Sequence, residues 1–287
     1  MIPTIETTLT QTVLERFAGC PDARFKTIMN SLVTHLHAFV RDVRLTDDEW
    51  MQAIQYLTAV GKKCTDTRQE FILHSDLLGV SSLVLEINHP PHAASLESAV
   101  LGPFYLEDAP ARPLGADLTD GMPGEPTFYS GCITDTSGRP IAGATLDIWS
   151  ADGAGFYDVQ LPGPLVKRGR GKITTAADGR YWFRSVKPAD YPVPTDGPGG
   201  VMLRKLERTP DRPGHLHLIV AAPGYTAVVT QIFVADSKFL DNDAVFGVKK
   251  SLAAKFERHA PGRAPNGEQM QVPYCTVQFD MRLLAAA

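Results

Sequence analysis

The sequence predicts a protein of mixed α and β class, in which an N-terminal helical region precedes an antiparallel β-sandwich. Apolar residues recur at helical spacing through the first hundred or so residues, as in amphipathic helices. Beyond them, short runs of strand-forming residues alternate with turns rich in Gly and Pro. The change falls at residues 88–92, where prolines cannot continue a helix. We therefore expect a helical domain over residues 1–100 and a β-sandwich domain over residues 101–287.

Three helices are expected in the first domain. The first lies within residues 25–43, where apolar side chains share one face. The second begins at a capping box formed by Thr46 and Glu49 and extends to Gly61. The third, over residues 67–87, is apolar on more than one side. Such a helix packs either between its own domain and a partner subunit or in a buried position within one subunit.

Apolar runs bounded by turn residues predict the strands of the second domain. Residues 127–134 and 144–149 flank a turn over residues 135–140, which predicts a strand, a turn and a second strand. Further strands are expected at residues 172–175, 179–185, 215–221, 227–234 and 274–283. Because these strands are short and separated by turns, they indicate an antiparallel sandwich.

The composition limits the classes of function. The 287 residues carry a formal net charge of −4 at pH 7, so no basic field attracts nucleic acid or anionic lipid. The first six residues lack the features of a signal peptide, and no apolar run has membrane-spanning length, so we expect a cytoplasmic protein. The four cysteines are far apart and predict neither a zinc knot nor a disulfide framework. We expect the partners to be small molecules or a second copy of the chain.

Two histidines, His215 and His217, stand two residues apart in an apolar run. Because side chains alternate between faces along a strand, both rings point the same way and can hold one metal ion. A pair of hydrogen-bonded structural histidines is the alternative, but a buried strand favours ligands, because unpartnered buried imidazoles are costly. A zinc site would need a further ligand such as a carboxylate. The aspartates available for it are Asp158, Asp190 and Asp196.

Two tyrosines lie upstream in settings that favour turns. Tyr157 follows the sequence Asp-Gly-Ala-Gly at residues 152–155, and Tyr191 precedes Pro192 in a proline-rich loop. For each of them the alternative to a functional role is an ordinary tyrosine that packs against its neighbours. A phenol must lose its proton to bind a metal, so a pair of phenolates suits a hard, highly charged ion. Ferric iron meets this requirement better than zinc.

Four separated motifs carry a resemblance to a known family. They are LGPFY at residues 101–105, the stretch at residues 143–157, YPVPTDGP at residues 191–198 and RPGHLH at residues 212–217. In this order they resemble the intradiol ring-cleaving catechol dioxygenases, which are mononuclear non-haem iron(III) enzymes. Residues 71–80 and 239–249 are most similar to the members that cleave hydroxyquinol.

The resemblance implies one Fe(III) per subunit and no NAD(P)H or flavin. The implied iron ligands are Tyr157, Tyr191, His215 and His217. Arg212, with Gln231 as its hydrogen-bonding companion, is the implied catalytic arginine that stabilises negative charge on the substrate, and Tyr191 is the implied acceptor of a substrate proton. A surface position is the alternative for Arg212. The implied substrate-binding residues are Leu73, Asp76, Val100, Leu101, Gly102 and Val245.

The implied reaction is cleavage of a dihydroxylated aromatic ring by dioxygen. The implied substrate is hydroxyquinol (benzene-1,2,4-triol), and the product is 3-hydroxy-cis,cis-muconate or maleylacetate. Asp76 is the candidate partner of the third hydroxyl, and its alternatives are an exposed helix aspartate or an ion pair. A catechol or chlorocatechol 1,2-dioxygenase that forms cis,cis-muconates is the second interpretation. A transthyretin-like binding module, suggested by a hairpin over residues 138–149, is the third.

The resemblance also implies a homodimer built on the N-terminal helices, in some members with a phospholipid at the dimer interface. Two positions depart from the family pattern. Gly214 stands where many relatives have Ala, and since the change is one methyl group we expect it to leave the ligands undisturbed. Gly199 and Gly200 stand where relatives often carry a bulkier residue, and we expect this to loosen the rim of the site.

Overall fold

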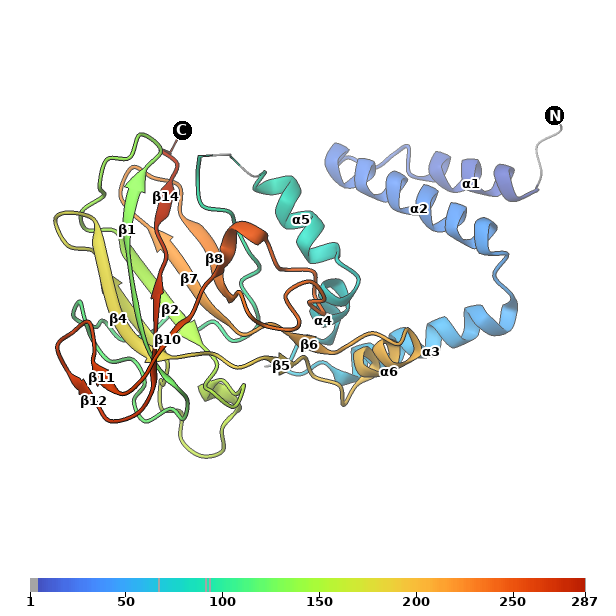
Figure 1. Ribbon diagram of the computed structural model, residues 1–287. Coiled ribbons are helices and arrows are strands. Elements are labelled where there is room, and N and C mark those ends of the chain that lie inside the picture. The colour runs from blue at the N-terminus through green and yellow to red at the C-terminus, as the bar shows by residue number, and fades with distance from the viewer. Residues whose placement is uncertain (1–4, 67, 91, 93, 287) are drawn as a thin grey trace. The chain divides into compact units, whose positions relative to one another are not determined.

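The computed structural model of the chain describes residues 5–66, 68–90, 92 and 94–286 (Figure 1). By compactness the chain divides into two units, residues 1–62 and 63–287. The first unit holds α1 (Ile5–Arg16), α2 (Ala23–Val43) and nearly all of α3 (Asp47–Lys63). Among the described residues, three further α-helices lie in the second unit together with the strands. The domain boundary at residue 100 therefore stays a prediction, distinct from the division after residue 62.

Side-chain caps define the helix ends in the first unit. The Asp22 carboxylate accepts a hydrogen bond from the Phe25 amide at 2.9 Å, and Arg44 ends α2 in the left-handed conformation, with φ of 53°. At the start of α3 the Thr46 amide donates to the Glu49 carboxylate at 2.9 Å. The Glu49 amide donates in return to the Thr46 hydroxyl at 3.3 Å. These reciprocal bonds confirm the predicted capping box.

No separate helix is predicted from the sequence at the position of α1. Polar contacts join α1 to α2. The Thr10 hydroxyl lies 2.9 Å from His37 Nδ1 and accepts a hydrogen bond from Arg41 at 3.0 Å. The predicted apolar face of α2 is exposed instead of being covered. Its most exposed large side chains are Phe25, Leu36, Phe39 and Val43, each more than half exposed.

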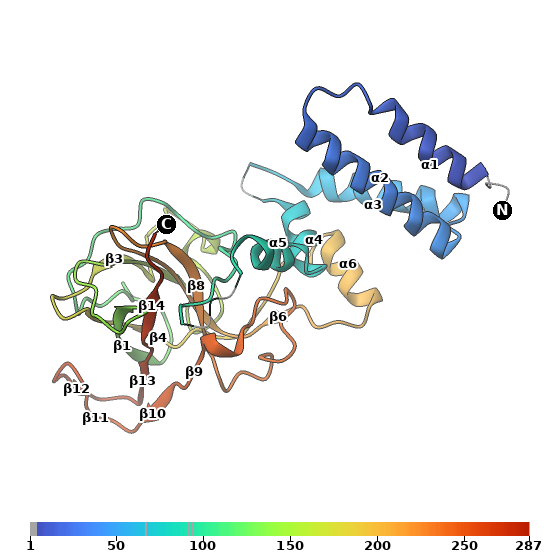
Figure 2. The ribbon, with the colours of Figure 1, turned by 90° about the horizontal axis from the view of Figure 1, so that it is seen from above.

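The single helix predicted over residues 67–87 is two helices in the structure. α4 (Glu70–Leu77) ends and α5 (Val80–Asn88) begins on either side of Leu78 and Gly79, and Gly79 has a φ of 74°. A right-handed helix cannot continue through this left-handed conformation, which glycine adopts at least cost. The single-helix prediction is therefore wrong, and its start at Thr67 lies outside the described residues. Helix α4 lies beside α6 (Pro198–Lys205), as Figure 2 shows.

Two sheets form a sandwich in the second unit. The first has the order β10-β13-β1-β14 with β4 also paired to β1, and the second has the order β3-β2-β7-β8-β9. The first sheet consists of β1 (Pro126–Asp135), β4 (Arg180–Val186), β10 (Glu257–His259), β13 (Tyr274–Gln278) and β14 (Met281–Leu283). The second consists of β2 (Thr145–Ser150), β3 (Arg170–Thr174), β7 (His215–Ala221), β8 (Val228–Val234) and β9 (Ala253–Ala254). The predicted class, a helical region followed by a sandwich, is confirmed.

The core lies between the two sheets. Leu146, Ile148 and Leu218 of the second sheet pack in one cluster with Ile133 and Phe183 of the first, and each is at most 2% exposed. Burying one such side chain contributes about 1.5–3 kcal/mol. This packing holds β7, which carries the two histidines, rigidly in the middle of its sheet.

The two strands and the turn predicted around residues 135–140 are present, but the strands belong to different sheets and do not pair with each other. β1 pairs with β4, β13 and β14, whereas β2 pairs with β3 and β7. Asp135 builds the turn, because its carboxylate accepts from the amides of Ser137 at 2.8 Å and Arg139 at 2.9 Å. After this turn the chain crosses to the other sheet.

The strand predicted over residues 274–283 is also divided, into β13 and β14, and β1 pairs with both in parallel. The break follows a close approach at Gly131, where a Cβ would lie 2.0 Å from the Phe279 carbonyl oxygen. The Asp280 carboxylate then accepts from the Cys132 amide at 2.9 Å. A continuous strand cannot follow β1 past this point.

The remaining elements are short. They are η1 (Asp158–Gln160), β5 (Tyr191–Pro192), β6 (Asp211–Arg212), η2 (Lys250–Leu252), β11 (Gly262–Arg263) and β12 (Gln269–Met270). Within the part of the chain that the structure describes, no helix is both long and apolar enough to cross a membrane.

Candidate active site

The four predicted metal ligands come from three segments of the second unit. His215 and His217 lie on β7 at the centre of its sheet, and both are buried. Tyr157 precedes η1 and is fully buried, while Tyr191 begins β5 and is half-buried. Because β5 pairs with β6, Tyr191 lies opposite Arg212. The fold thus brings together residues that are up to 60 positions apart in the sequence.

Their donor atoms converge. The hydroxyl oxygens of Tyr157 and Tyr191 are 3.3 Å apart, Tyr191 Oη is 3.3 Å from His215 Nε2, and His215 Nε2 is 3.1 Å from His217 Nε2. Ligand atoms that each bind one ion at about 2.1 Å are about 3.0–3.4 Å from one another. The spacing of these four atoms fits a single metal ion between them.

Burial controls the protonation of these groups. It lowers the pKa of His215 to about 3 and the pKa of His217 well below its usual value, so both imidazoles are neutral at pH 7. Burial also raises the pKa of the Tyr157 phenol well above its usual value, and the neighbouring Tyr191 adds to this shift. Neutral imidazoles are ready to bind, but a buried phenol gives up its proton only to a strong positive charge. The donor set therefore fits a highly charged ion.

Neighbouring groups orient the two imidazoles. His215 Nδ1 lies 2.7 Å from the Pro213 carbonyl oxygen, which can only accept, so Nδ1 carries the proton and Nε2 presents its lone pair to the site. The His217 ring instead stacks on Trp149, with centroids 4.8 Å apart and planes 8° from parallel. This role of Trp149 cannot be predicted from the sequence, because the stacking depends on the register between β2 and β7.

The aspartates considered for a zinc site do not join the histidines. Asp158 pairs with the buried Arg170, Asp190 accepts from the Gly214 amide, and Asp196 is bound by basic side chains. Among the described residues, no group of three or more His, Cys, Asp or Glu is placed to hold a metal ion. The tyrosines are needed to complete the donor set.

Arg212 is buried beside the ligands, which excludes a surface position. Its Nη1 lies 3.2 Å from His215 Nε2, and its Nη2 donates to the Gln231 side-chain oxygen at 3.2 Å, as the predicted pairing requires. Its strongest partner is Asp243, which accepts from Nε at 2.9 Å. Burial opposes the charge of the guanidinium, but Asp243 together with Tyr191 and Tyr157 keeps the pKa of Arg212 above its usual value. Asp243 was not foreseen, because only the fold brings its loop to this arginine.

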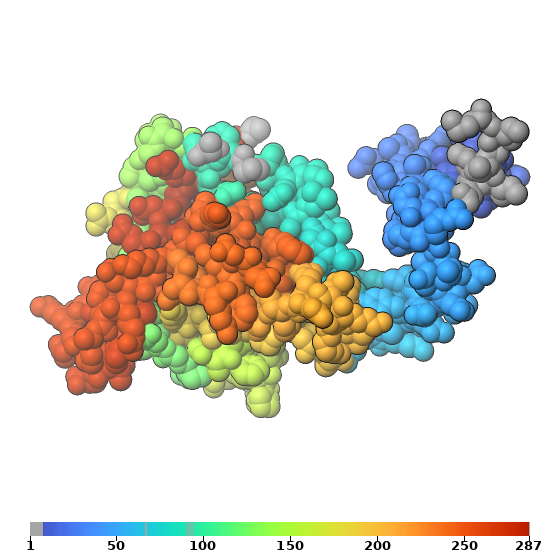
Figure 3. All heavy atoms as spheres, turned by 45° about the vertical axis from the view of Figure 1, so that its right-hand side comes forward, coloured from blue at the N-terminus to red at the C-terminus, as the bar shows by residue number. Residues whose placement is uncertain are grey.

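Helix α4 supplies one wall beside the site. Leu73, Asp76 and Leu77 follow the spacing of one helix face, and Leu73 and Leu77 pack in the same cluster as Val245. Burial raises the pKa of the half-buried Asp76 carboxyl, although a hydrogen bond from the Ser81 side chain and the positive charge of Arg212 act in the opposite direction. In the space-filling view the surface of α4 and α5 borders the segment around residue 245 (Figure 3).

Residues 100–102 pass directly along the ligands. The Val100 carbonyl accepts from the Gln231 side-chain amide at 2.6 Å, and Leu101 is 40% exposed. Gly102 has a φ of 74°, and a Cβ there would lie 3.0 Å from His217 Cε1. Gly102 thus lies beside the predicted ligand His217 and Val100 beside Gln231, whereas the contacts of the predicted substrate-binding residues with a substrate stay a prediction.

Comparison with known proteins identifies the family. Residues 100–284 match the family described as "Dioxygenase", and residues 22–95 match "Catechol dioxygenase N terminus". The chain belongs to the intradiol dioxygenase family. Membership makes it an enzyme and removes the alternative of a non-catalytic binding module.

Similar members share most of their length with this dioxygenase. It is 49% identical to 6-chlorohydroxyquinol 1,2-dioxygenase from Cupriavidus pinatubonensis, over 88% of this chain and 92% of that protein. It is also 49% identical to hydroxyquinol 1,2-dioxygenase from a Rhizobium species, over 88% and 86% of the two chains. The crystal structure of hydroxyquinol 1,2-dioxygenase from Pseudomonas putida DLL-E4 superposes with a TM-score of 0.93, at 41% identity over 98% of this chain and 99% of that one.

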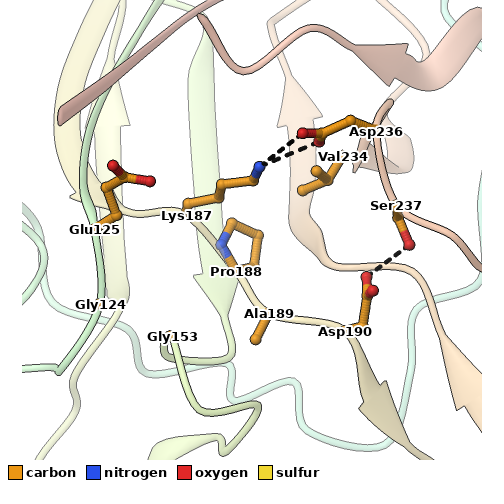
Figure 4. Close-up of a pocket in the computed structure, with 10 residues that line it drawn as sticks. All are labelled: Gly124, Glu125, Gly153, Lys187, Pro188, Ala189, Asp190, Val234, Asp236 and Ser237. Atoms are coloured by element: carbon orange, nitrogen blue, oxygen red, sulfur yellow. Dashed lines mark hydrogen bonds and ion pairs between the residues drawn. The ribbon is translucent and has the colours of Figure 1, made fainter. Parts of the chain in front are cut away.

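In this dioxygenase, the segment that carries Tyr191 is held tightly against β7. The Asp190 carboxylate accepts from the Gly214 amide at 2.8 Å and from the Ser237 hydroxyl at 2.6 Å, and Figure 4 shows the latter bond at the edge of a cavity of about 310 Å³. A Cβ on Gly214 would lie 2.2 Å from the Pro188 carbonyl oxygen. With glycine at residue 214 the four donor atoms converge, whereas a methyl group there would require the backbone before Tyr191 to move.

We predict that Gly214→Ala lowers the free energy of unfolding by about 1–3 kcal/mol, because it overpacks this contact. Gly262→Ala is the matched control, since a Cβ there meets only one atom, at 3.7 Å. Urea unfolding of both variants checks the prediction. Equal stability of Gly214→Ala and the wild-type enzyme would contradict it.

Proposed function

We propose that this enzyme cleaves hydroxyquinol between two adjacent hydroxylated carbons, with dioxygen, at a mononuclear iron(III) centre. The product is 3-hydroxy-cis,cis-muconate or its tautomer maleylacetate. The observation that carries the proposal is the convergence of two buried imidazoles and two phenols on one point. The substrate is supported by the similar proteins, which are named hydroxyquinol or 6-chlorohydroxyquinol 1,2-dioxygenases.

Tyr157, Tyr191, His215 and His217 are the proposed iron ligands. Two phenolates cancel most of the charge of a trivalent ion, which lowers the cost of burying it. When bound there, iron(III) would withdraw electron density from a chelated diolate and make its ring reactive toward dioxygen. No NAD(P)H or flavin is then required, because the substrate itself is the reductant.

The protein's own groups handle the substrate's proton and charge. Tyr191 is half-buried whereas Tyr157 is fully buried, so Tyr191 is the phenol that an entering substrate reaches and the proposed acceptor of its proton. Arg212 stays charged beside His215, oriented by Asp243 and Gln231. A fixed guanidinium in a buried site stabilises negative charge that develops on the ring. We assign the catalytic roles to Arg212, Gln231 and Tyr191 on this basis.

The substrate ring lies, in this proposal, between α4 and the segment at residues 100–102. Its contacts are Leu73, Asp76, Val100, Leu101, Gly102 and Val245. Asp76 distinguishes a triol from a diol, because its carboxyl is half-buried and, among the described residues, makes no ion pair. A third ring hydroxyl would add a second hydrogen bond to the one that this carboxyl accepts from the Ser81 side chain.

Oxygen consumption tests the proposed function. Iron-loaded enzyme is mixed with hydroxyquinol, catechol or chlorinated catechols, and kcat/KM is measured for each. We expect the highest value for hydroxyquinol, with one molecule of dioxygen consumed per triol. A higher kcat/KM for catechol or a chlorocatechol would contradict the proposed substrate, and no uptake with any of them would contradict the reaction.

Replacement of Asp76 tests its role in selecting the triol. We predict that Asp76→Ala lowers kcat/KM for hydroxyquinol about tenfold or more relative to catechol, because only the triol loses a hydrogen bond. Asp178→Ala, at an exposed turn, is the control that should leave the ratio unchanged. Equal losses on both substrates would reject this role.

The exposed apolar face of α2 supports a homodimer built on the N-terminal helices, with a phospholipid at the interface. The exposed apolar side chains of α2, which include Phe25, Leu36 and Phe39, follow one face of the helix. Single exposed apolar residues are common on protein surfaces, but a continuous apolar face of this kind is typical of an interface. We predict a dimer in sedimentation velocity, converted to monomer by Leu36→Glu with Phe39→Glu but not by Ser31→Glu. A monomeric wild-type protein at micromolar concentration would contradict the dimer.

Mass spectrometry of an organic extract of the purified protein tests for the phospholipid at the dimer interface. An extract without phospholipid would contradict its presence there.

A further inference from the structure

Helix α6 contains two adjacent glycines in its first turn, Gly199 and Gly200. Each costs a helix about 1 kcal/mol relative to Ala, so each calls for a reason. For Gly200 the reason is the backbone, because a Cβ there would lie 2.1 Å from the Thr195 carbonyl oxygen. No such backbone contact explains Gly199.

The space beside Gly199 is bordered by side chains of α4. A Cβ at residue 199 would lie 3.2 Å from Leu73 Cδ2, 3.2 Å from Leu77 Cδ1 and 3.5 Å from Glu70 Oε1. Contacts of 3.2 Å are tighter than ordinary van der Waals distance, so a neighbouring side chain would have to yield. A side chain at residue 199 therefore fits only if a side chain of α4 moves.

Helix α6 itself cannot retreat. The buried Glu70 carboxylate accepts from the Gly199 amide at 3.2 Å and from Arg68 at 2.8 Å. Arg68 also pairs with Asp196 at 2.9 Å, just before the helix. These bonds fix the start of α6 to the start of α4, so added bulk at residue 199 would act on the leucines.

Of the two leucines, Leu73 is the one that can move. Leu77 is 0% exposed and is enclosed by Val193, Leu203 and Val245, whereas Leu73 is half-buried. Leu73 would have to yield away from α6. It shares its helix face with Asp76, whose carboxyl feels the charge of Arg212 at the ligand site.

We propose that Gly199 is a specificity-determining residue that acts through Leu73. The missing side chain leaves room for Leu73 to withdraw toward α6, so the site accepts a hydroxyquinol whose ring carries a substituent such as chlorine. This inference rests on the proposed function, in which Leu73 contacts the substrate ring. Gly199 does not touch the substrate; it sets the position of a residue that does.

Substrate selectivity of Gly199 variants tests the inference. Gly199→Val is compared with the wild-type enzyme by measuring kcat/KM for hydroxyquinol and for 6-chlorohydroxyquinol. We expect the ratio of chlorinated to unsubstituted substrate to fall about tenfold, the scale on which one misplaced methyl group counts in an apolar pocket. Gly199→Ala, which adds one methyl group, should lower the ratio less and keeps the test readable if valine destabilises α6.

Rescue separates this role from a merely structural one. Leu73→Ala, added to Gly199→Val, should restore the wild-type ratio by removing the side chain that was displaced. A folded, active Gly199→Val enzyme with an unchanged ratio, or a double variant without recovery, would overturn the inference. These outcomes leave the proposed function intact, whereas failure of the wild-type enzyme to turn over any diol or triol would overturn both.

Discussion

The structure depends on one constraint, the convergence at a single point of the four proposed metal ligands, of which three are buried and Tyr191 is half-buried. Their donor atoms lie 3.1–3.3 Å apart, and His215 and Tyr157 are both completely shielded from solvent. In such surroundings the imidazoles are neutral and the Tyr157 phenol holds its proton, as the directions of their pKa shifts indicate. A buried cluster of this kind is satisfied only when a strong positive charge replaces the phenolic protons. This requirement makes a hard trivalent ion the best occupant.

The fold meets this constraint with rigid supports. The register of β2, β7 and β8 places Trp149 and Gln231 on either side of His217, one stacking on its ring and the other joining Arg212. Pairing of β5 with β6 sets Tyr191 opposite Arg212. The close contact between Gly214 and Pro188 leaves no room for the backbone before Tyr191 to shift. The walls of the substrate pocket belong to helices and loops outside the sheets. Selectivity can therefore vary while the ligand geometry stays fixed.

Local features could be predicted from the sequence more fully than contacts between distant parts of the chain. The two-residue spacing of His215 and His217 and the capping box at Thr46 follow from strand and helix geometry alone, and both are present. The break at Gly79 was missed because apolar spacing continues across it, while the left-handed conformation there is set by packing. Asp243 was missed because an ion pair between residues 31 positions apart leaves no local pattern. The tightness at Gly214 likewise exists only where two distant backbones meet.

We propose that these four groups form a site for ferric iron, and a metal titration tests this proposal. Metal-free protein is titrated with ferric iron or with zinc while its visible absorption is recorded. We expect one equivalent of ferric iron to produce a visible band from phenolate-to-iron charge transfer, and zinc to produce none. Tyr157→Phe and Tyr191→Phe should each weaken or shift the band, whereas Tyr225→Phe, remote from the site, should not. A colourless iron-loaded protein, or a band unaffected by both ligand substitutions, would contradict the account.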